Sequence, residues 1–319
     1  MFSDYKPPLL YKNAHLAAIL PNQLRKTSLP KSNRISITTA DDDFLDLDIY
    51  SQNHKRAVIL VHGLEGSSQS TYIKGMAQQM LESNFDAICL NMRGCSGRPN
   101  KQFCAYHSGK TEDLETVVQH FSSRYAQLVL IGFSLGGNLV LKYTGERGSS
   151  ISKKVSATIG ISVPLDLAGS CDTLSLSHNK LYLTRFLRQL SKKAKQKAID
   201  FPDSGLQPEQ FEHLKDFRAF DNLYTAPAHG FADANEYYAK CSAKQFLKNI
   251  HIPTLIINAK NDTFLSESCY PKPAELSESI TYLAPNYGGH VGFASNIWMN
   301  RPFWSEQCSA KFLTKTLGS

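Results

Sequence analysis

A serine in a glycine-rich turn is the residue of this sequence best placed for covalent chemistry. Ser134 is the centre of Gly132–Gly136 (GFSLG), a G-x-S-x-G motif that directly follows the apolar run Leu128–Phe133. Where a strand precedes this motif and a helix follows it, the sharp turn exposes the serine at the carboxyl end of the strand. The flanking glycines let the backbone crowd together without a Cβ clash. We therefore expect Ser134 to be a nucleophile; the alternative is a glycine-rich helix start in which Gly137 and its neighbours serve packing only.

A serine hydroxyl needs a base to accept its proton and a carboxylate to orient that base. In this architecture the chain order is serine, acid, histidine. Asp262 follows the apolar run Pro253–Asn258, and His290 lies in a glycine-containing loop after the last expected strand. We therefore expect His290 to be the base. Asp262 is the favoured acid, and Asp166, which follows the strand ending at Val163, is the alternative.

The loop His62–Gly66 (HGLEG) follows the buried strand type Ala57–Val61. A loop in this place normally donates one backbone N–H to the oxyanion, and the residue after the nucleophile donates the other. The expected donors are the amides of Leu64 and Leu135. His62 lies too early in the chain to be the base, so we expect it to brace the loop through hydrogen bonds.

Two basic features allow a binding role or a structural one. Arg93, in the turn after the next strand, could bind a substrate carboxylate, but we favour a role in tying neighbouring loops together. The helical stretch Leu181–Ala198 could rest on anionic lipid, but we favour a solvated face over membrane-surface contact. Its basic residues are Arg185, Arg188, Lys192, Lys193, Lys195 and Lys197. Because no metal-ligand spacing, dinucleotide motif or P-loop is present, we expect neither a metal nor a cofactor.

The composition is that of a globular protein with a large core. The 319 residues are 42% hydrophobic and 10% aromatic, which excludes global disorder. A net charge of +7 is too mild for a dedicated nucleic-acid binder. No apolar run is long enough for a membrane-spanning helix, and the first residues lack the apolar stretch of a signal peptide. The 7 cysteines, which form no C-x-x-C pair, indicate free thiols in a reducing compartment, so we expect a cytoplasmic protein.

Short apolar runs alternate with helical patterns in the first half of the chain, which predicts βαβ units and a mainly parallel sheet. The expected strands are Ile35–Thr38, Phe44–Tyr50, Ala57–Val61, Ala87–Asn91, Leu128–Phe133 and Val155–Val163, the first two forming an antiparallel hairpin. The expected helices are Thr71–Glu82, Glu112–Arg124 and Ser134–Glu146.

This alternation stops between Pro164 and Ile250, where helical stretches dominate and no clear strand is found. Later elements are the strands Pro253–Asn258 and Ser279–Leu283 and a helix near Ser305–Leu317. The fold class is therefore α/β, with a mostly parallel sheet flanked by helices. Residues 1–163 and 251–319 are expected to form the core, and residues 164–250 a helical lid.

Motifs spread over nearly the whole chain resemble the YheT-like branch of the α/β-hydrolase superfamily, also called AB hydrolase family 4. They are Asn13–Leu16, His62–Gly66, Asn91–Gly97, the Ser134 turn, Phe220-Asp221, Tyr224–Phe231, Tyr237-Tyr238, Asn261-Asp262 and Gly288–His290. The resemblance implies an α/β-hydrolase fold with a lid and a triad of Ser134, Asp262 and His290, and so favours Asp262 over Asp166. Around the acid, where this chain reads Asn261–Phe264 (NDTF), the resemblance implies a second Asp and a Pro in many relatives, so the chain departs from the family pattern in this loop.

We expect a serine hydrolase that cleaves carboxylic esters through an acyl-enzyme. Its partners would be short- to medium-chain acyl esters or acylglycerol-type lipids, and no nucleic acid. One alternative is an acyltransferase on the same triad, against which the absence of an H-x-x-x-x-D motif counts. Another is a non-catalytic ligand-binding relative, which the filled triad positions disfavour. Dehalogenases and epoxide hydrolases would carry Asp in place of Ser134.

Overall fold

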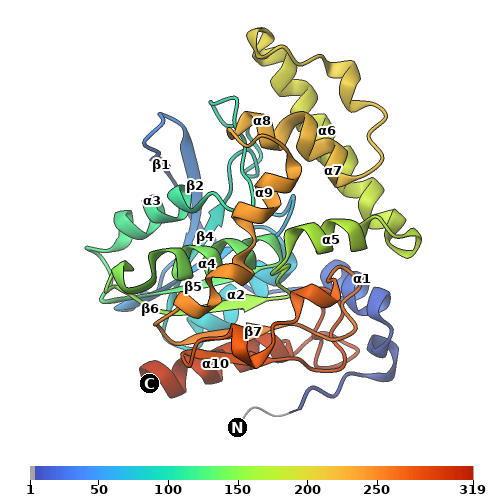
Figure 1. Ribbon diagram of the computed structural model, residues 1–319. Helices are drawn as coiled ribbons and strands as arrows, with labels where there is room; N and C mark the ends of the chain where they lie inside the picture. The colour runs from blue at the N-terminus through green and yellow to red at the C-terminus, as the bar shows by residue number, and fades with distance from the viewer. Residues whose placement is uncertain (1–3, 319) are drawn as a thin grey trace.

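One eight-stranded sheet forms the centre of the computed structural model, which describes residues 4–318 (Figure 1). The strand order is β1-β2-β4-β3-β5-β6-β7-β8. The strands are β1 (Asn33–Thr38), β2 (Phe44–Tyr50), β3 (Arg56–Val61), β4 (Asp86–Asn91), β5 (Gln127–Phe133), β6 (Val155–Ile161), β7 (Thr254–Ile257) and β8 (Ile280–Leu283). β2 runs antiparallel to both β1 and β4, and every other pairing is parallel.

Helices cover both faces of the sheet. The α-helices are α1 (Ala14–Leu24), α2 (Thr71–Leu81), α3 (Thr111–Phe121), α4 (Leu135–Arg147), α5 (Leu167–Leu174), α6 (Lys180–Asp200), α7 (Phe217–Phe220), α8 (Ala226–Ala228), α9 (Ala234–Cys241) and α10 (Trp304–Leu317). Apolar residues of α2 and α10 pack in one core cluster with side chains of the sheet. Apolar residues of α3 and α4 form a second cluster with the other side chains of the same strands. The central strands are buried on both faces, which explains their continuous apolar sequences.

The expected fold class is confirmed, and the expected strands and helices are found within a few residues of their predicted ends. β6 stops at Ile161 rather than Val163, because Ser162 has a φ of +52° and leaves the extended conformation. The backbone N–H and C=O of Val163 instead bond to the side chain of Asn258 at 2.7 and 3.0 Å. Ser134 itself precedes α4 and does not belong to it. The helix α1 has no counterpart among the predicted elements, and its interior holds Pro21.

Between β6 and β7 the described chain is helical, without a strand. Figure 1 shows α6–α9 gathered above the sheet at the top of the view, with α10 on its opposite side. These helices have an apolar cluster of their own, built around Leu183, Phe217, Phe220 and Tyr237. The following 3-10 helix, Ala243–Asn249, packs instead with Leu141 of α4. The helical segment is therefore anchored on the sheet domain at its C-terminal end.

Substitution of Gly136 by Ala should severely destabilise the protein. An added Cβ would lie 2.4 Å from the carbonyl oxygens of both Val61 and His62, and backbone atoms cannot move aside locally. We expect a loss of about 3 kcal/mol or more in the free energy of unfolding, measured by urea titration. As a control, Gly205→Ala meets nothing within 4 Å at a φ of +76° and should lose only about 1 kcal/mol. Equal losses in the two variants would contradict this prediction.

Candidate active site

The nucleophile candidate sits on a strained turn between β5 and α4. Ser134 has a φ of +52°, which is rare for a residue with a side chain. Its backbone N–H donates to Ile161 O at 2.9 Å, which fixes the turn to the end of β6. A Cβ on Gly132 would lie 2.1 Å from the carbonyl oxygen of Gly136, so the turn requires glycine at both positions. Ser134 is thereby held at the carboxyl edge of the sheet with its side chain free of the helix.

His290 reaches Ser134 from a loop after β8. Its Nε2 lies 2.8 Å from Ser134 Oγ. The loop is held on both sides of the histidine: the N–H of Gly289 donates to Asn261 Oδ1 at 3.0 Å, and that of Val291 donates to Ser162 Oγ at 2.9 Å. These contacts hold the imidazole against the serine hydroxyl.

Asp262 completes the line of hydrogen bonds. His290 Nδ1 lies 2.9 Å from Asp262 Oδ2 and 3.1 Å from Oδ1. The carboxylate also accepts the N–H of Phe264 at 3.0 Å and is fully buried. Since a carboxylate only accepts, Nδ1 carries the proton and Nε2 is left to accept from Ser134.

The alternative acid, Asp166, has a different position and different partners. It caps the N-terminus of α5 by accepting the N–H of Gly169 at 3.3 Å, and it accepts the Ser268 hydroxyl at 2.5 Å. The structure therefore brings Asp262, and not Asp166, next to His290.

His62 braces the loop after β3, as the sequence analysis expected. It is fully buried, its Nε2 accepts the N–H of Met92 at 3.1 Å, and its Nδ1 donates to Gly63 O at 2.7 Å. Burial lowers the pKa of His62 to about 4, with a smaller contribution from Lys193, so the ring is neutral. Leu64 and Leu135 line the same cavity as Ser134, and their role as oxyanion donors stays a prediction.

Arg93 ties loops together, which confirms the favoured interpretation of this residue. Its guanidinium is almost completely buried and binds three carboxylates. The contacts are bidentate to Asp113 (2.6 and 2.8 Å) and to Asp41 (2.6 and 2.9 Å), with Asp43 at 3.3 Å. A guanidinium occupied in this way has no donor pair left for a substrate carboxylate.

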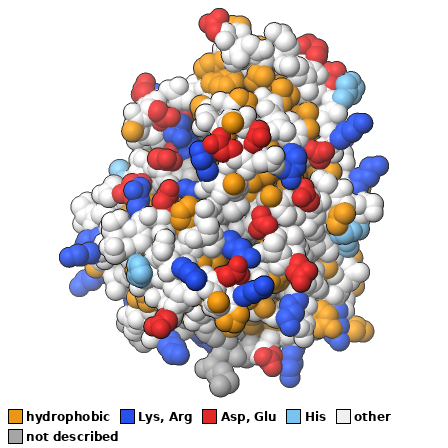
Figure 2. All heavy atoms as spheres, in the orientation of Figure 1, with side chains coloured by type: hydrophobic (Ala, Val, Ile, Leu, Met, Phe, Trp, Pro, Cys, Tyr) orange, Lys and Arg blue, Asp and Glu red, His pale blue; other side chains and the backbone are white. Residues whose placement is uncertain are grey.

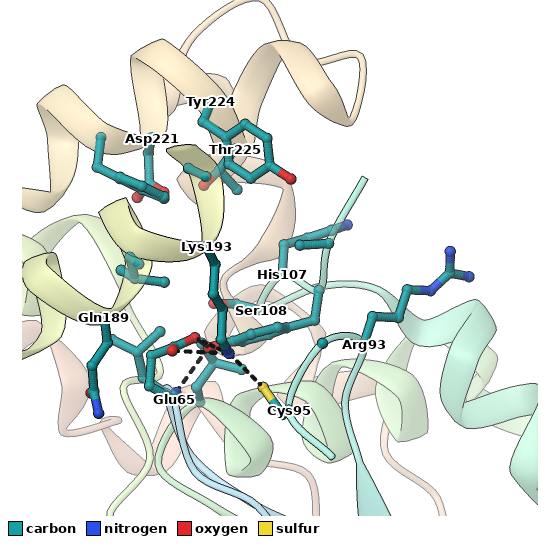
Figure 3. Close-up of a pocket in the computed structure, with 18 of the residues that line it drawn as sticks. Glu65, Arg93, Cys95, His107, Ser108, Gln189, Lys193, Asp221, Tyr224 and Thr225 are labelled. Carbon is teal, nitrogen blue, oxygen red and sulfur yellow. Dashed lines mark hydrogen bonds and ion pairs between the residues drawn. The ribbon is translucent and has the colours of Figure 1, made fainter. Parts of the chain in front are cut away.

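A cavity of about 690 Å³ lies between the sheet edge and the helices above it. Ser134 and Leu135 line it from the sheet side, and α5, α7 and α9 contribute mainly apolar side chains, among them Leu167 and Phe217. The residues of α6 that line it are mostly polar or charged, with Leu190 and Ala194 as the apolar ones. Figure 3 shows Asp221, Tyr224 and Thr225 on the helices above the cavity, and Glu65 and Lys193 reaching toward each other across it. The volume is that of a pocket for a drug-sized or lipid-like molecule.

The expected solvated basic face on α6 is wrong for Lys197, and Lys193, whose side chain is 39% exposed, has a partner across the cavity. Lys197 is buried, and its Nζ donates to the carbonyl oxygen of Asn100 at 2.8 Å. Lys193 pairs with Glu65 inside the cavity. The remaining basic residues of the helix are at least partly exposed. On the face seen in Figure 2, basic and acidic side chains are interspersed and form no uniform basic field.

Sequence reasoning missed Phe264 beside the triad and the side chain of Glu65 in the adjoining cavity. Phe264 stacks on the His290 ring, with 4.2 Å between ring centroids and an angle of 25° between planes. Glu65 lies in the HGLEG motif, from which the sequence predicts a role only for the backbone N–H groups. The Phe264–His290 and Glu65–Lys193 contacts have no local sequence signal, because each joins segments that are distant in the chain.

Other features of the described residues bear on cofactors and location. Within residues 4–318, no group of three or more His, Cys, Asp or Glu side chains is arranged to hold a metal ion. All seven cysteines are free thiols, and all but Cys104 are buried. None of the helices in this range combines the length and apolar character needed to cross a bilayer.

Comparison with known proteins finds relatives along nearly the whole chain. A sequence profile described as the alpha/beta hydrolase fold matches residues 56–296. The chain is 32% identical to "Putative esterase YheT" of Escherichia coli (strain K12), covering 99% of this chain and 94% of that protein. It is 30% identical to "Phospholipase ABHD3" of Mus musculus, covering 87% of this chain and 70% of that protein. Among solved structures, the Pyrococcus furiosus esterase Pf2001 superposes with a TM-score of 0.58 at 14% identity, covering 92% of this chain and 100% of that one.

Replacing His62 should flatten the pH dependence of stability. The folded pKa of about 4 lies below the ordinary value of 6.5, so between these pH values the unfolded chain binds a proton that the folded chain does not. The stabilisation is complete above pH 6.5 and is lost as the pH falls, by about 2 kcal/mol between pH 7 and pH 5. His62→Gln, which keeps an acceptor for Met92, should lose correspondingly less over this range in urea titrations. The exposed His120→Gln serves as control, and a wild-type pH dependence in His62→Gln would contradict the prediction.

Proposed function

The chain belongs to the alpha/beta hydrolase fold family, and from that premise we propose that it hydrolyses carboxylic esters through Ser134, His290 and Asp262. The observation that carries the proposal is the unbroken line of hydrogen bonds from Ser134 Oγ through His290 to Asp262, at 2.8 and 2.9 Å. This is the geometry in which a base activates a hydroxyl and a carboxylate orients the base. Relatives named as an esterase and a phospholipase support the reaction class.

In the proposed mechanism Ser134 Oγ attacks the ester carbonyl while His290 Nε2 accepts the hydroxyl proton. Asp262 holds the Nδ1–H tautomer and stabilises the imidazolium that forms. His290 then passes the proton to the departing alcohol as the tetrahedral intermediate collapses to an acyl-enzyme. A water molecule, deprotonated by the same histidine, attacks the acyl-enzyme and releases the carboxylic acid.

The negative charge of the tetrahedral intermediate would be stabilised by the backbone N–H groups of Leu64 and Leu135. Leu135 is the first residue of α4, so its N–H lies at the positive end of the helix. Each donor of this kind contributes on the order of 3 kcal/mol to lowering the barrier. Both residues line the cavity beside Ser134, which supports the assignment.

The proposed substrates are short- to medium-chain acyl esters or acylglycerol-type lipids, taken up under a lid formed by residues 164–250. Support comes from the apolar side chains that α5, α7 and α9 contribute to the cavity, and from its volume of about 690 Å³. Ala243–Asn249, packed on α4, would be the anchor of the lid. The free cysteines support a reducing, cytoplasmic environment for this reaction.

Ser134→Ala should abolish ester hydrolysis without unfolding the protein, because it removes only the nucleophilic oxygen. We expect kcat to fall by at least about 10⁴-fold on p-nitrophenyl esters from acetyl to palmitoyl. A fluorophosphonate probe should label the wild type and leave the variant unlabelled. Wild-type turnover by Ser134→Ala would show that another residue carries the chemistry.

Replacing each candidate acid by Asn distinguishes the catalytic carboxylate from the one with a structural role. Asp262→Asn should lower kcat by about 10⁴-fold, because the amide can favour the wrong histidine tautomer. Asp166→Asn weakens a helix cap and the contact with the Ser268 hydroxyl, and should change stability by about 1 kcal/mol with kcat nearly unchanged. Steady-state kinetics and urea titration of both variants test this. The reverse pattern would make Asp166 the acid.

A further inference from the structure

An ion pair joins the helices above the cavity to the loop after β3. Lys193 of α6 lies 2.9 Å from each carboxylate oxygen of Glu65, and its Nζ is 3.3 Å from Cys95 Sγ. Figure 3 shows these contacts as dashed lines, with Lys193 descending from its helix to the loop. Burial raises the pKa of Cys95 to about 12, so its thiol is neutral and adds no charge to this contact.

Glu65 is held through both its backbone and its side chain. Its backbone has a φ of +52°, a conformation that needs support from its surroundings. The N–H of Glu65 donates to the Tyr106 hydroxyl at 2.8 Å, and that hydroxyl donates to Glu65 Oε1, also at 2.8 Å. Glu65 is the residue that directly follows Leu64, so whatever fixes Glu65 also fixes the plane of the peptide next to the expected oxyanion donor.

The charge of Lys193 matters because the carboxylate is buried. The side chain of Glu65 is 3% exposed, and Lys193 is the cation that the described structure places within ion-pair distance of it. A buried carboxylate that loses its cation is strongly unfavourable, so the loop would have to shift to hydrate it. Such a shift would displace Leu64.

We propose that Lys193 is a positioning residue that fastens α6 to the loop 62–66, and that its ion pair with Glu65 holds the Leu64 N–H where the oxyanion forms. The proposal rests on the proposed ester hydrolysis for its catalytic part. In this proposal, closure of the helical segment also completes the oxyanion hole, because the segment supplies the cation of the ion pair and the loop supplies the anion.

Kinetics of matched variants test the catalytic part. Lys193→Met and Glu65→Gln should each lower kcat by about 10- to 100-fold, since a displaced donor loses part of the effect of an absent one, with little change in KM. The double variant should be no slower than either single variant, because both remove the same interaction. Lys193→Arg should recover most of the kcat lost in Lys193→Met. The control is Lys195→Met on the same helix, which removes the ion pair of Lys195 with Glu212 and should behave as wild type.

A rise in KM alone, or additive losses of kcat in the double variant, would overturn the positioning role. Hydrogen exchange supplies a measurement that does not depend on turnover. The amides of a peptide spanning 62–70 should exchange faster in Lys193→Met and Glu65→Gln than in wild type and Lys195→Met. If amide exchange in this peptide is the same in both variants as in wild type, Lys193 does not hold the loop, whatever the activity of the variants. If the wild type neither hydrolyses esters nor reacts with fluorophosphonate, the proposed function fails, and exchange alone then decides whether Lys193 fastens the loop.

Discussion

The close backbone approach between the turn after β5 and the loop after β3 is the constraint on which the site depends. The two strands are parallel neighbours, paired from Arg56 opposite Gln127 to Val61 opposite Gly132, so their carboxyl ends meet at one edge. A Cβ on Gly63 would lie 3.0 Å from the Cβ of Ser134. Sheet register and glycine therefore bring the turn that carries the nucleophile next to the loop that carries Leu64.

The histidine loop depends on a different part of the chain. A Cβ on Gly289 would lie 2.5 Å from the carbonyl oxygen of Ala14, and one on Gly292 would lie 2.4 Å from that of Ala17. The loop that carries His290 thus packs directly on the backbone of α1. The helix α1 therefore supports the loop that carries the base, although nearly the whole sequence separates the helix from the loop.

The difference between these two regions explains what the sequence could and could not predict. Strands such as Ala57–Val61 and the Ser134 turn were predictable because their signals are local: apolar runs, glycine and motif order. The packing of α1 against the histidine loop was not predictable, since the two segments lie at opposite ends of the chain. The same holds for the acid, where motif order left Asp166 as an alternative and only the contact with His290 separates the two. The pairing of Lys193 could not be predicted from the basic helix either, because a lysine whose partner is distant in the chain has no distinctive neighbours in sequence.

The helix α6 therefore has more than one function in the structure. Its Tyr182 ring packs edge-on against Phe264 at 4.7 Å, and Phe264 in turn stacks on His290 at 4.2 Å. Farther along the same helix, Lys193 holds Glu65 beside the expected oxyanion donor. One rigid element thus touches the surroundings of the base at one point and the oxyanion loop at another. Because both contacts are made by the same helix, a rigid movement of α6 away from the sheet would break both.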